Sequence, residues 1–202
     1  MLKICGITDS VFACAAAEGR VDYLGFIFAN GSPRGIEPVR ATEIISAVRR
    51  RRTIPRMVGV FTPRPVADIL RISDEVGFDV VQLHGRYVPE DVAAVKASGR
   101  EVWLLDDGGD PCATVADGIL IDGVKGDQLG GTGELSDWSR VAVVKAAGKK
   151  AILAGGLSVE NIADAYATGA DVLDVNSSLE TAPGVKSLDL LAPLLRKLNE
   201  VM

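Results

Sequence analysis

Histidine and cysteine are scarce in this chain of 202 residues, which has one His and three Cys. Cys5, Cys14 and Cys112 are widely spaced and odd in number, which argues against a disulfide framework and for a reducing compartment. There is no Cys-x-x-Cys, and His84 alone cannot supply the usual set of zinc ligands. The sequence therefore predicts neither a disulfide-stabilised fold nor a metal site.

The chain also lacks long apolar runs and an excess of basic residues. No apolar run is long enough to cross a membrane, and strand-like sequence begins almost at Met1, which leaves no room for a signal peptide. Lys and Arg number 22 against 27 Asp and Glu, so the net charge of −5 gives no support for nucleic acid or an anionic membrane as partner. The basic run 49–52 is interpreted as the solvated C-terminal end of a helix, with nucleic-acid contact as the alternative. We expect a soluble, cytoplasmic protein.

What the chain does have is a regular alternation of short apolar runs and helical patterns. Hydrophobic residues make up 48% of it, enough for a sizeable core, and its length suits one domain over residues 1–202. Strands are expected at 2–5, 21–28, 56–61, 79–83, 101–105, 118–121, 150–153 and 170–175. Helices are expected from a cap at residue 8 or 9 to 18, and at 39–50, 65–76, 89–97, 136–147 with Ser136 as cap, 159–167 and 187–201, with a short helical turn at 176–180.

Eight strands alternating with helices at about 25 residues per unit predict a parallel α/β fold. Eight units favour closure into a (β/α)8 TIM barrel, a lean one because such barrels typically have about 250 residues. The segment 106–117 is rich in Gly, Asp and Pro, so its helix is expected to be short or absent. An open doubly wound sheet is the alternative, but it would normally carry Gly-x-Gly-x-x-Gly after the first strand, where this chain has Cys-Gly-Ile-Thr.

Polar residues follow the expected strands at the face where barrel enzymes build their active sites. The position that these residues share indicates an active site more specifically than any single residue does. The residues are Cys5 after the first strand, Arg34 after the second, His84 after the fourth, Asp122 after the sixth, Gly155 and Gly156 after the seventh, and Asp174, Asn176, Ser177 and Ser178 after the eighth.

Cys5 and Asp122 are the candidate proton-transfer groups. A thiol and a carboxyl at two strand ends form an acid–base pair, each serving one face of a small substrate. The alternatives are that Cys5 is a small buried hydrophobe and that Asp122 begins an Asx-turn in the loop that closes on 130–133. A Cys–His dyad with His84 is a further alternative, although a lone His is more often structural.

The loops after the last two strands predict a phosphate site. Barrel enzymes often bind phosphate with these loops and the N-terminus of a short extra helix, where backbone N–H groups face the dianion. Gly155, Gly156 and the run 176–178 fit that use; the alternative is a tight turn and a helix cap. Arg34 has the planar guanidinium that binds a carboxylate bidentately, although an exposed loop Arg would look the same in sequence.

Seven ordered motifs resemble the phosphoribosylanthranilate isomerase family along nearly the full chain. They are KICG at 3–6, GFIF with SPR at 25–28 and 32–34, VGVF at 58–61, VQLHG at 81–85, GGTG at 130–133, LAGGL with EN at 153–157 and 160–161, and DVNSSLE with PGVKS at 174–180 and 183–187. Ser187 and Ser178 depart from the Asp and Gly that many members have there, and 106–117 matches little.

The resemblance implies an aldose–ketose isomerase of tryptophan biosynthesis that needs no cofactor or metal. It would carry out the Amadori rearrangement of N-(5-phosphoribosyl)anthranilate to 1-(2-carboxyphenylamino)-1-deoxy-D-ribulose 5-phosphate, as a monomer or homodimer. Asp122 would be the general acid and Cys5 the general base. Arg34 would bind the anthranilate carboxylate, His84 and Asp174 would contact the substrate, and the loops at 155–156 and 176–178 would bind its phosphate.

Three rival functions share these features. The related histidine-pathway isomerase acts on a phosphoribosyl-aminoimidazole and resembles a two-carboxylate design, with Asp where this chain has Cys5. A dual-substrate enzyme would also be expected to use Asp there. A non-catalytic phosphosugar-binding barrel would need neither Cys5 nor Asp122, so the presence of both favours an enzyme.

Overall fold

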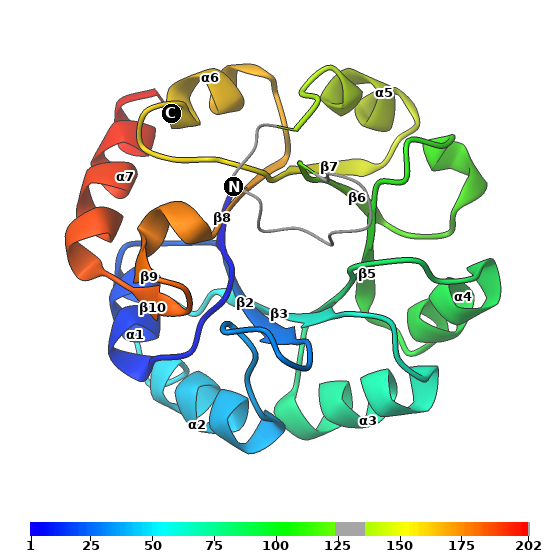
Figure 1. Ribbon diagram of the computed structural model, residues 1–202, viewed down its shortest axis with the longest axis horizontal. Helices are drawn as coiled ribbons and strands as arrows, with labels where there is room; N and C mark the ends of the chain where they lie inside the picture. Colours follow the sequence, from blue (N-terminus) through cyan, green and yellow to red (C-terminus); the bar gives the residue numbers. More distant parts are fainter. Residues whose placement is uncertain (124–135, 202) are drawn as a thin grey trace.

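The computed structural model describes residues 1–123 and 136–201. Eight parallel strands form a closed barrel in chain order, and helices surround it (Figure 1). The strands are β1 (Leu2–Ile4), β2 (Tyr23–Phe28), β3 (Arg56–Phe61), β4 (Val80–Leu83), β5 (Glu101–Leu105), β6 (Gly118–Ile121), β7 (Lys150–Leu153) and β8 (Val172–Val175). Strand β1 pairs with both β2 and β8, which closes the barrel and confirms the predicted (β/α)8 fold.

The helices follow the strands with one interruption. They are α1 (Ser10–Glu18), α2 (Pro38–Val48), α3 (Val66–Val76), α4 (Pro89–Ala97), α5 (Arg140–Ala146), α6 (Ile162–Ala167) and α7 (Leu188–Val201). Between β5 and β6 the chain forms only the 3-10 turn η1 (Pro111–Ala113), as its Gly, Asp and Pro content predicts. No helix among the described residues is long and apolar enough to cross a membrane.

Two apolar layers hold the barrel. Large aliphatic and aromatic side chains pack between strands and helices, while a second cluster fills the lumen, with Val58, Trp103 and Ile152 among its members. Parallel strands buried on both faces have nearly continuous apolar sequences, which is why these runs could be recognised. Within the lumen, residues two apart on one strand point inward together.

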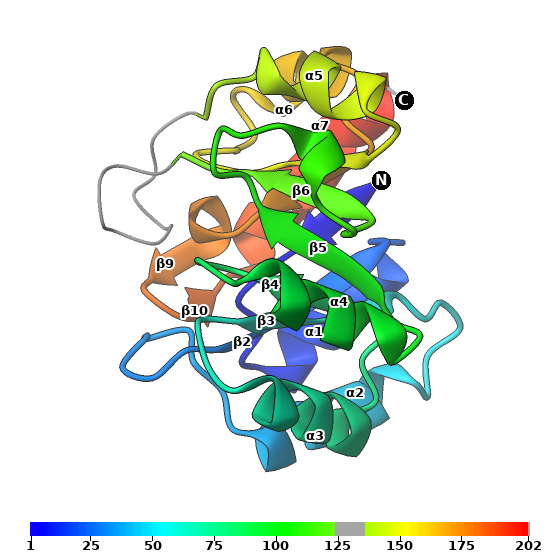
Figure 2. The ribbon, with the colours of Figure 1, turned by 90° about the vertical axis from the view of Figure 1, so that its right-hand side faces the viewer.

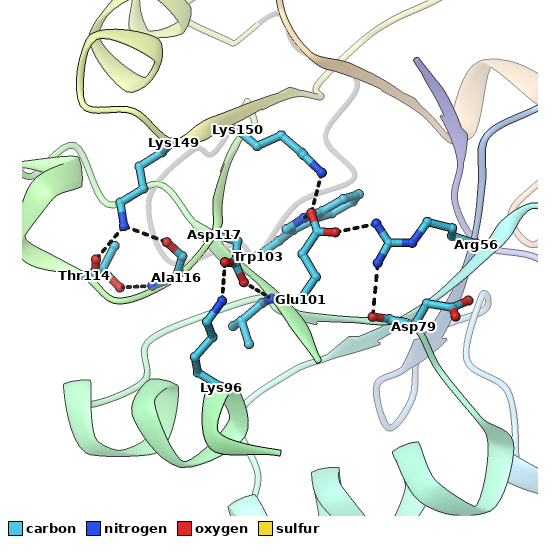
Figure 3. A network of polar contacts seen from close by, with 11 residues as sticks. Arg56, Asp79, Lys96, Glu101, Trp103, Thr114, Ala116, Asp117, Lys149 and Lys150 are labelled. Carbon is cyan, nitrogen blue, oxygen red and sulfur yellow. Dashed lines mark hydrogen bonds and ion pairs between the residues drawn. The ribbon is translucent and has the colours of Figure 1, made fainter. Parts of the chain in front are cut away.

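The mouth at the N-terminal ends of the strands is closed by a charged network around Glu101 (Figure 3). The Glu101 carboxylate accepts from Lys150 Nζ at 2.5 Å, from the Trp103 indole N–H at 2.7 Å, and from Arg56. The Trp103 ring contacts Tyr23 edge-on, with centroids 5.1 Å apart. The contacts of Glu101 therefore link β3, β5 and β7 across this end of the lumen.

Four aspartates repeat one hydrogen bond around the same mouth. Each immediately precedes an even-numbered strand and accepts from the first or second backbone N–H of the preceding odd-numbered strand. We call these four bonds the aspartate clamps. They are Asp22 to Leu2 N at 2.7 Å, Asp79 to Met57 N at 2.7 Å, Asp117 to Val102 N at 2.8 Å and Asp171 to Ala151 N at 2.8 Å.

The predicted helix at 136–147 was wrong at its start. Helix α5 begins at Arg140, and Ser136 does not cap it; its hydroxyl instead donates to Ala154 O at 2.7 Å and ties the chain to the end of β7. Asp9, one of the two caps considered for α1, does accept from Phe12 N. Pro65 precedes α3 as its N-cap residue instead of lying in its first turn.

A short antiparallel hairpin was not predicted. It consists of β9 (Glu180–Ala182) and β10 (Val185–Lys186), and follows the 3-10 turn η2 (Ser177–Leu179) after β8. In Figure 2 this hairpin projects from the left side of the barrel, opposite the N-terminus. It therefore adds charged side chains to the rim of the open end.

Candidate active site

A cavity of about 220 Å³ opens at the C-terminal ends of the strands. Nine of the ten residues predicted from sequence line it; Ser178 does not. The lining residues are Cys5, Ile27, Ala29, Ser32, Arg34, Val60, Thr62, Gln82, His84, Leu120, Asp122, Ala154, Gly155, Gly156, Leu157, Asp174, Asn176 and Ser177. The motif at 130–133 lies outside the described residues.

The two-residue repeat of the strands explains why these polar groups converge. Cys5 lies two residues beyond the buried Lys3 of β1, and Asp122 lies two beyond Leu120 of β6. Asp174 on β8 and Asn176, which directly follows that strand, form a similar series and line the cavity. A polar residue that follows an apolar strand, an even number of positions after a residue that points into the lumen, also points inward. Its side chain therefore lies at the open end of the lumen.

Asp122 is a partly buried carboxyl at the end of β6. Burial raises its pKa, while a backbone hydrogen bond from Gly123 and the charge of Lys3 oppose the rise. The net result is a carboxyl that holds its proton more strongly than an exposed Asp. That property suits a general acid.

Cys5 lies on another wall, and the residue is 5% exposed. Burial raises its pKa, and the Lys3 ammonium beside it works in the opposite direction. Lys3 is fully buried, and its Nζ lies 2.5 Å from Oδ2 of Asp174. Sequence reasoning missed Lys3, although a lysine in the apolar run 2–5 was a signal that a buried charge needed a partner.

Arg34 is held by a carboxylate at the rim. Its Nε and Nη2 donate to the two oxygens of Glu180 at 2.8–3.1 Å. Lys186 Nζ donates to the same carboxylate at 2.9 Å and to the backbone and side-chain oxygens of Asn176, each at 2.8 Å. Burial raises the pKa of Glu180, but the two cations outweigh it and lower the pKa. The hairpin thus orients Arg34, a role that its sequence did not reveal.

The loops after β7 and β8 form one side of the cavity. Gly155 and Gly156 both have positive φ, 82° and 62°, which favours glycine in this turn. Asn161 fixes the turn by donating from Nδ2 to Gly156 O at 3.0 Å. Ser178 joins the two loops, since its hydroxyl donates to Leu157 O at 2.6 Å. It therefore supports the loops from behind the cavity.

Two further buried acceptors belong to residues that line the cavity. Oε1 of Gln82 and Oδ1 of Asp174 have no hydrogen-bond partner among the described residues, although both side chains are almost fully buried. Buried polar atoms normally have partners, so these two oxygens are exceptions at the wall of the cavity. His84 also lines this wall, and its positive charge would lower the pKa of Asp174.

No group of three or more His, Cys, Asp or Glu residues that could hold a metal ion occurs in the described ranges. The arrangement instead offers a carboxyl, a thiol, an oriented guanidinium and a glycine turn around one small cavity. These groups suit proton transfer on a small molecule that carries anionic groups.

Residues 2–197 match the model of the N-(5'phosphoribosyl)anthranilate (PRA) isomerase family. N-(5'-phosphoribosyl)anthranilate isomerase of Geotalea daltonii is 35% identical over 214 residues, which cover 100% of this chain and 97% of the relative. The crystal structure of phosphoribosyl anthranilate isomerase from Thermus thermophilus has a TM-score of 0.88 at 33% identity, covering 100% of this chain and 99% of the other. Another isomerase, crystallised with reduced 1-(o-carboxyphenylamino)-1-deoxyribulose 5-phosphate, has a TM-score of 0.82 at 26% identity, covering 98% of each chain.

Proposed function

Because the chain belongs to the N-(5'-phosphoribosyl)anthranilate isomerase family, and so acts in tryptophan biosynthesis, we propose that Asp122 and Cys5 carry its proton transfers. The observation that carries this proposal is their placement on one cavity, from the non-adjacent strands β6 and β1. Two proton-transfer groups on separate walls can serve two atoms of one substrate without exchanging a proton directly.

Asp122 acts first as the general acid. Its carboxyl proton goes to the ribose ring oxygen as the C1′–O bond breaks, and the anthranilate nitrogen lone pair forms the C1′ iminium. The raised pKa of Asp122, caused by burial, supports this role because the acid must retain a proton to donate.

Cys5 then acts as the general base. Its thiolate removes the proton from C2′, and the C2′–H electrons form the C1′=C2′ bond of an enolamine as the iminium charge is neutralised. Proton return to C1′ and loss of the O2′ proton give the ketone, so the product is an isomer of the substrate. Only 5% of Cys5 is exposed, which keeps water away from the sulfur during this step.

The remaining residues bind the substrate. Arg34 receives the anthranilate carboxylate at its Nη1 end, which forms no hydrogen bond with the described residues while Glu180 occupies the Nε and Nη2 side. The glycine turn 155–156 with Asn176 and Ser177 receives the phosphate, and Ser178 supports that loop. His84 and Asp174 contact the substrate. The phosphosugar found with a relative of the same fold supports this assignment of a binding end for each anionic group.

We further propose a single catalytic domain that works as a monomer or homodimer in the cytoplasm, without cofactor or metal. Light scattering of the purified protein tests the oligomeric state, and activity after exhaustive chelation tests the absence of a metal. A chelator-sensitive rate that returns with added metal contradicts it.

The test of the function is a fluorescence assay of N-(5-phosphoribosyl)anthranilate consumption. The substrate decays spontaneously, so the rate must exceed the enzyme-free background. We expect turnover by the parent protein and its loss in Cys5→Ser, with substrate binding retained. Equal loss of binding and preserved turnover per bound substrate would remove Cys5 from the catalytic role.

A further inference from the structure

Lys3 is a buried charge that the acid–base pair does not use. It lies in the lumen on β1, two residues before Cys5, with no exposed surface. A lysine is almost never fully buried unless it is paired, because removing an ammonium from water is unfavourable. The ammonium of Lys3, beneath the cavity, must therefore be paired with a buried negative charge.

Asp174 is that partner. Lys3 and Asp174 stand opposite each other in the β1–β8 pairing, and their ion pair is 2.5 Å long. A buried ion pair is weak evidence for stability, because an apolar pair of similar volume is often as stable. A role in the neighbouring site explains better why two charges stand in the middle of this lumen.

The gap left by Gly25 on β2 brings Lys3 and Cys5 together. A Cβ atom at Gly25 would lie 3.0 Å from the Cys5 sulfur and 3.1 Å from Lys3 Cε. Both atoms therefore border the same space, which any larger residue would fill. The backbone of Gly25 is not in the left-handed region, so the reason for glycine here is room.

We propose that Lys3 is a positioning residue of the isomerisation, whose ammonium, held by Asp174, stabilises the negative charge on Cys5 when that sulfur acts as base. This inference rests on the proposed role of Cys5. Lys3 gives up no proton: the thiolate takes the C2′ proton and becomes a thiol, while the ammonium remains. Consistent with this, burial opposes the charge on Lys3, yet Asp174 and Cys5 together raise its pKa.

Other charges also act on Cys5. Lys186 from β10 and Arg34 from the loop after β2 are cations near the sulfur, and both are engaged with Glu180. Asp174 opposes the thiolate, and Asp122 and His84 act across the cavity through their effects on Lys3 and Asp174. Lys3 and Asp174 thus act on the same sulfur with opposite signs, which provides a sharp test.

The test is the titration of Cys5 as the only thiol, in a Cys14→Ala/Cys112→Ser background. Thiolate is followed by ultraviolet absorbance and by the rate of alkylation with iodoacetamide across pH. Lys3→Met should move the titration to higher pH and slow alkylation at neutral pH by about tenfold, the effect of one pKa unit. Asp174→Asn should move it to lower pH. Lys150→Met, which removes a lysine paired with Glu101 at the opposite mouth, should leave it unchanged.

Lys3→Met leaves Asp174 buried and unpaired, so this variant could fail to fold. A double variant keeps the proposal testable in that case. Lys3→Met/Asp174→Asn removes both charges and is compared with Asp174→Asn alone. A titration at higher pH in the double variant supports the proposal. Identical titrations in that pair, or in Lys3→Met and its folded parent, overturn it.

Kinetics then separate this inference from the function beneath it. If Cys5 is the base, the basic limb of kcat/KM against pH must shift with the thiol titration in each variant. A shifted titration with an unmoved kinetic limb overturns the positioning role. The proposed role of Cys5 is tested separately by Cys5→Ser, in which Lys3 is unchanged. If this variant retains turnover, Cys5 is not the base, whatever the titrations show.

Discussion

At the scale of single residues, Asp122 carries the first expected outcome. Asp122→Asn keeps the shape of the side chain but has no acidic proton, so the ring oxygen must leave without help. We expect turnover to fall by about 10²–10⁴-fold, the usual contribution of a general acid, with little change in KM. The assay is substrate fluorescence. A rise in KM with turnover preserved would instead make Asp122 a binding residue.

The pH profile gives a second test of the same pair. The active form combines protonated Asp122 with the Cys5 thiolate. Burial raises the pKa of both groups. A carboxyl ordinarily titrates well below a thiol. The kcat/KM profile is therefore expected to be a bell, falling at low pH where both groups are protonated and at high pH where both are ionised.

The pH dependence of the residual activity of Asp122→Asn shows which group is responsible for each limb of the kcat/KM profile. Only the thiolate is then required, so activity should rise with pH until Cys5 is ionised and should not fall again. A preserved fall at high pH would assign that limb to a different group. In the parent enzyme, each unit by which the two pKa values approach one another enriches the active form about tenfold.

Arg34 is expected to contribute binding more than chemistry. Arg34→Ala removes charge-assisted hydrogen bonds of about 1.5–3 kcal/mol, so KM should rise by roughly tenfold to a hundredfold with a smaller change in kcat. Arg52→Ala, at an exposed position after α2, is the matched control. An unchanged KM in Arg34→Ala removes it from the carboxylate role.

Site residues that end an apolar run could be predicted from sequence, because strand parity fixes where their side chains point. Cys5, His84 and Asp122 are of this kind, and all three line the cavity. Residues that act through another residue could not be predicted, because their pairing depends on strands and loops distant in sequence. Glu180, for example, is 146 residues from the arginine that it orients.

At the scale of elements, the sequence predicted all eight strands because each is buried on both faces. Helix starts were harder, since a capping serine and a serine bonded to a neighbouring loop look alike; Ser136 is the second kind. The β9–β10 hairpin has no apolar alternation of its own. Lys186 and Glu180 hold it against the barrel through contacts that only the folded chain creates.

The aspartate clamps make a prediction about stability. Asp22→Ala removes the acceptor for the N–H of buried Leu2, so the free energy of unfolding should fall by about 1–3 kcal/mol. Urea denaturation followed by circular dichroism measures it. Glu43→Ala breaks an exposed ion pair on α2 and should cost less than about 1 kcal/mol. Equal effects of the two substitutions would show that the clamp contributes no more than a surface pair.

At the scale of the whole molecule, the closed mouth links stability to pH. Burial raises the pKa of Glu101, but Lys150, Trp103 and Arg56 outweigh it, so the pKa lies below the ordinary value of 4.5. A carboxylate with a lowered pKa stabilises the fold above its unfolded pKa, and that stability is lost as the pH falls through the folded pKa. Asp174 has a raised pKa and contributes in the opposite direction.

Melting temperature measured against pH tests this linkage. The parent protein should lose stability as the pH falls below the ordinary range of Glu. Glu101→Gln should have a lower melting temperature than the parent at neutral pH, and its melting temperature should fall less as the pH decreases. Glu18→Gln, in an exposed pair, should follow the parent curve. A Glu101→Gln curve parallel to that of the parent would show that other carboxylates control the acid transition.

The spacing of the aspartate clamps divides the barrel into four covalent modules, each made of two strands and the helix or turn between them. Every clamp closes within a module and none crosses to the next. A circular permutant with new ends near Gly99, between two modules, keeps each clamp inside a continuous stretch of chain. One opened near Gly77 separates β3 from its own aspartate, so it must recover that bond across a break and should fold more slowly.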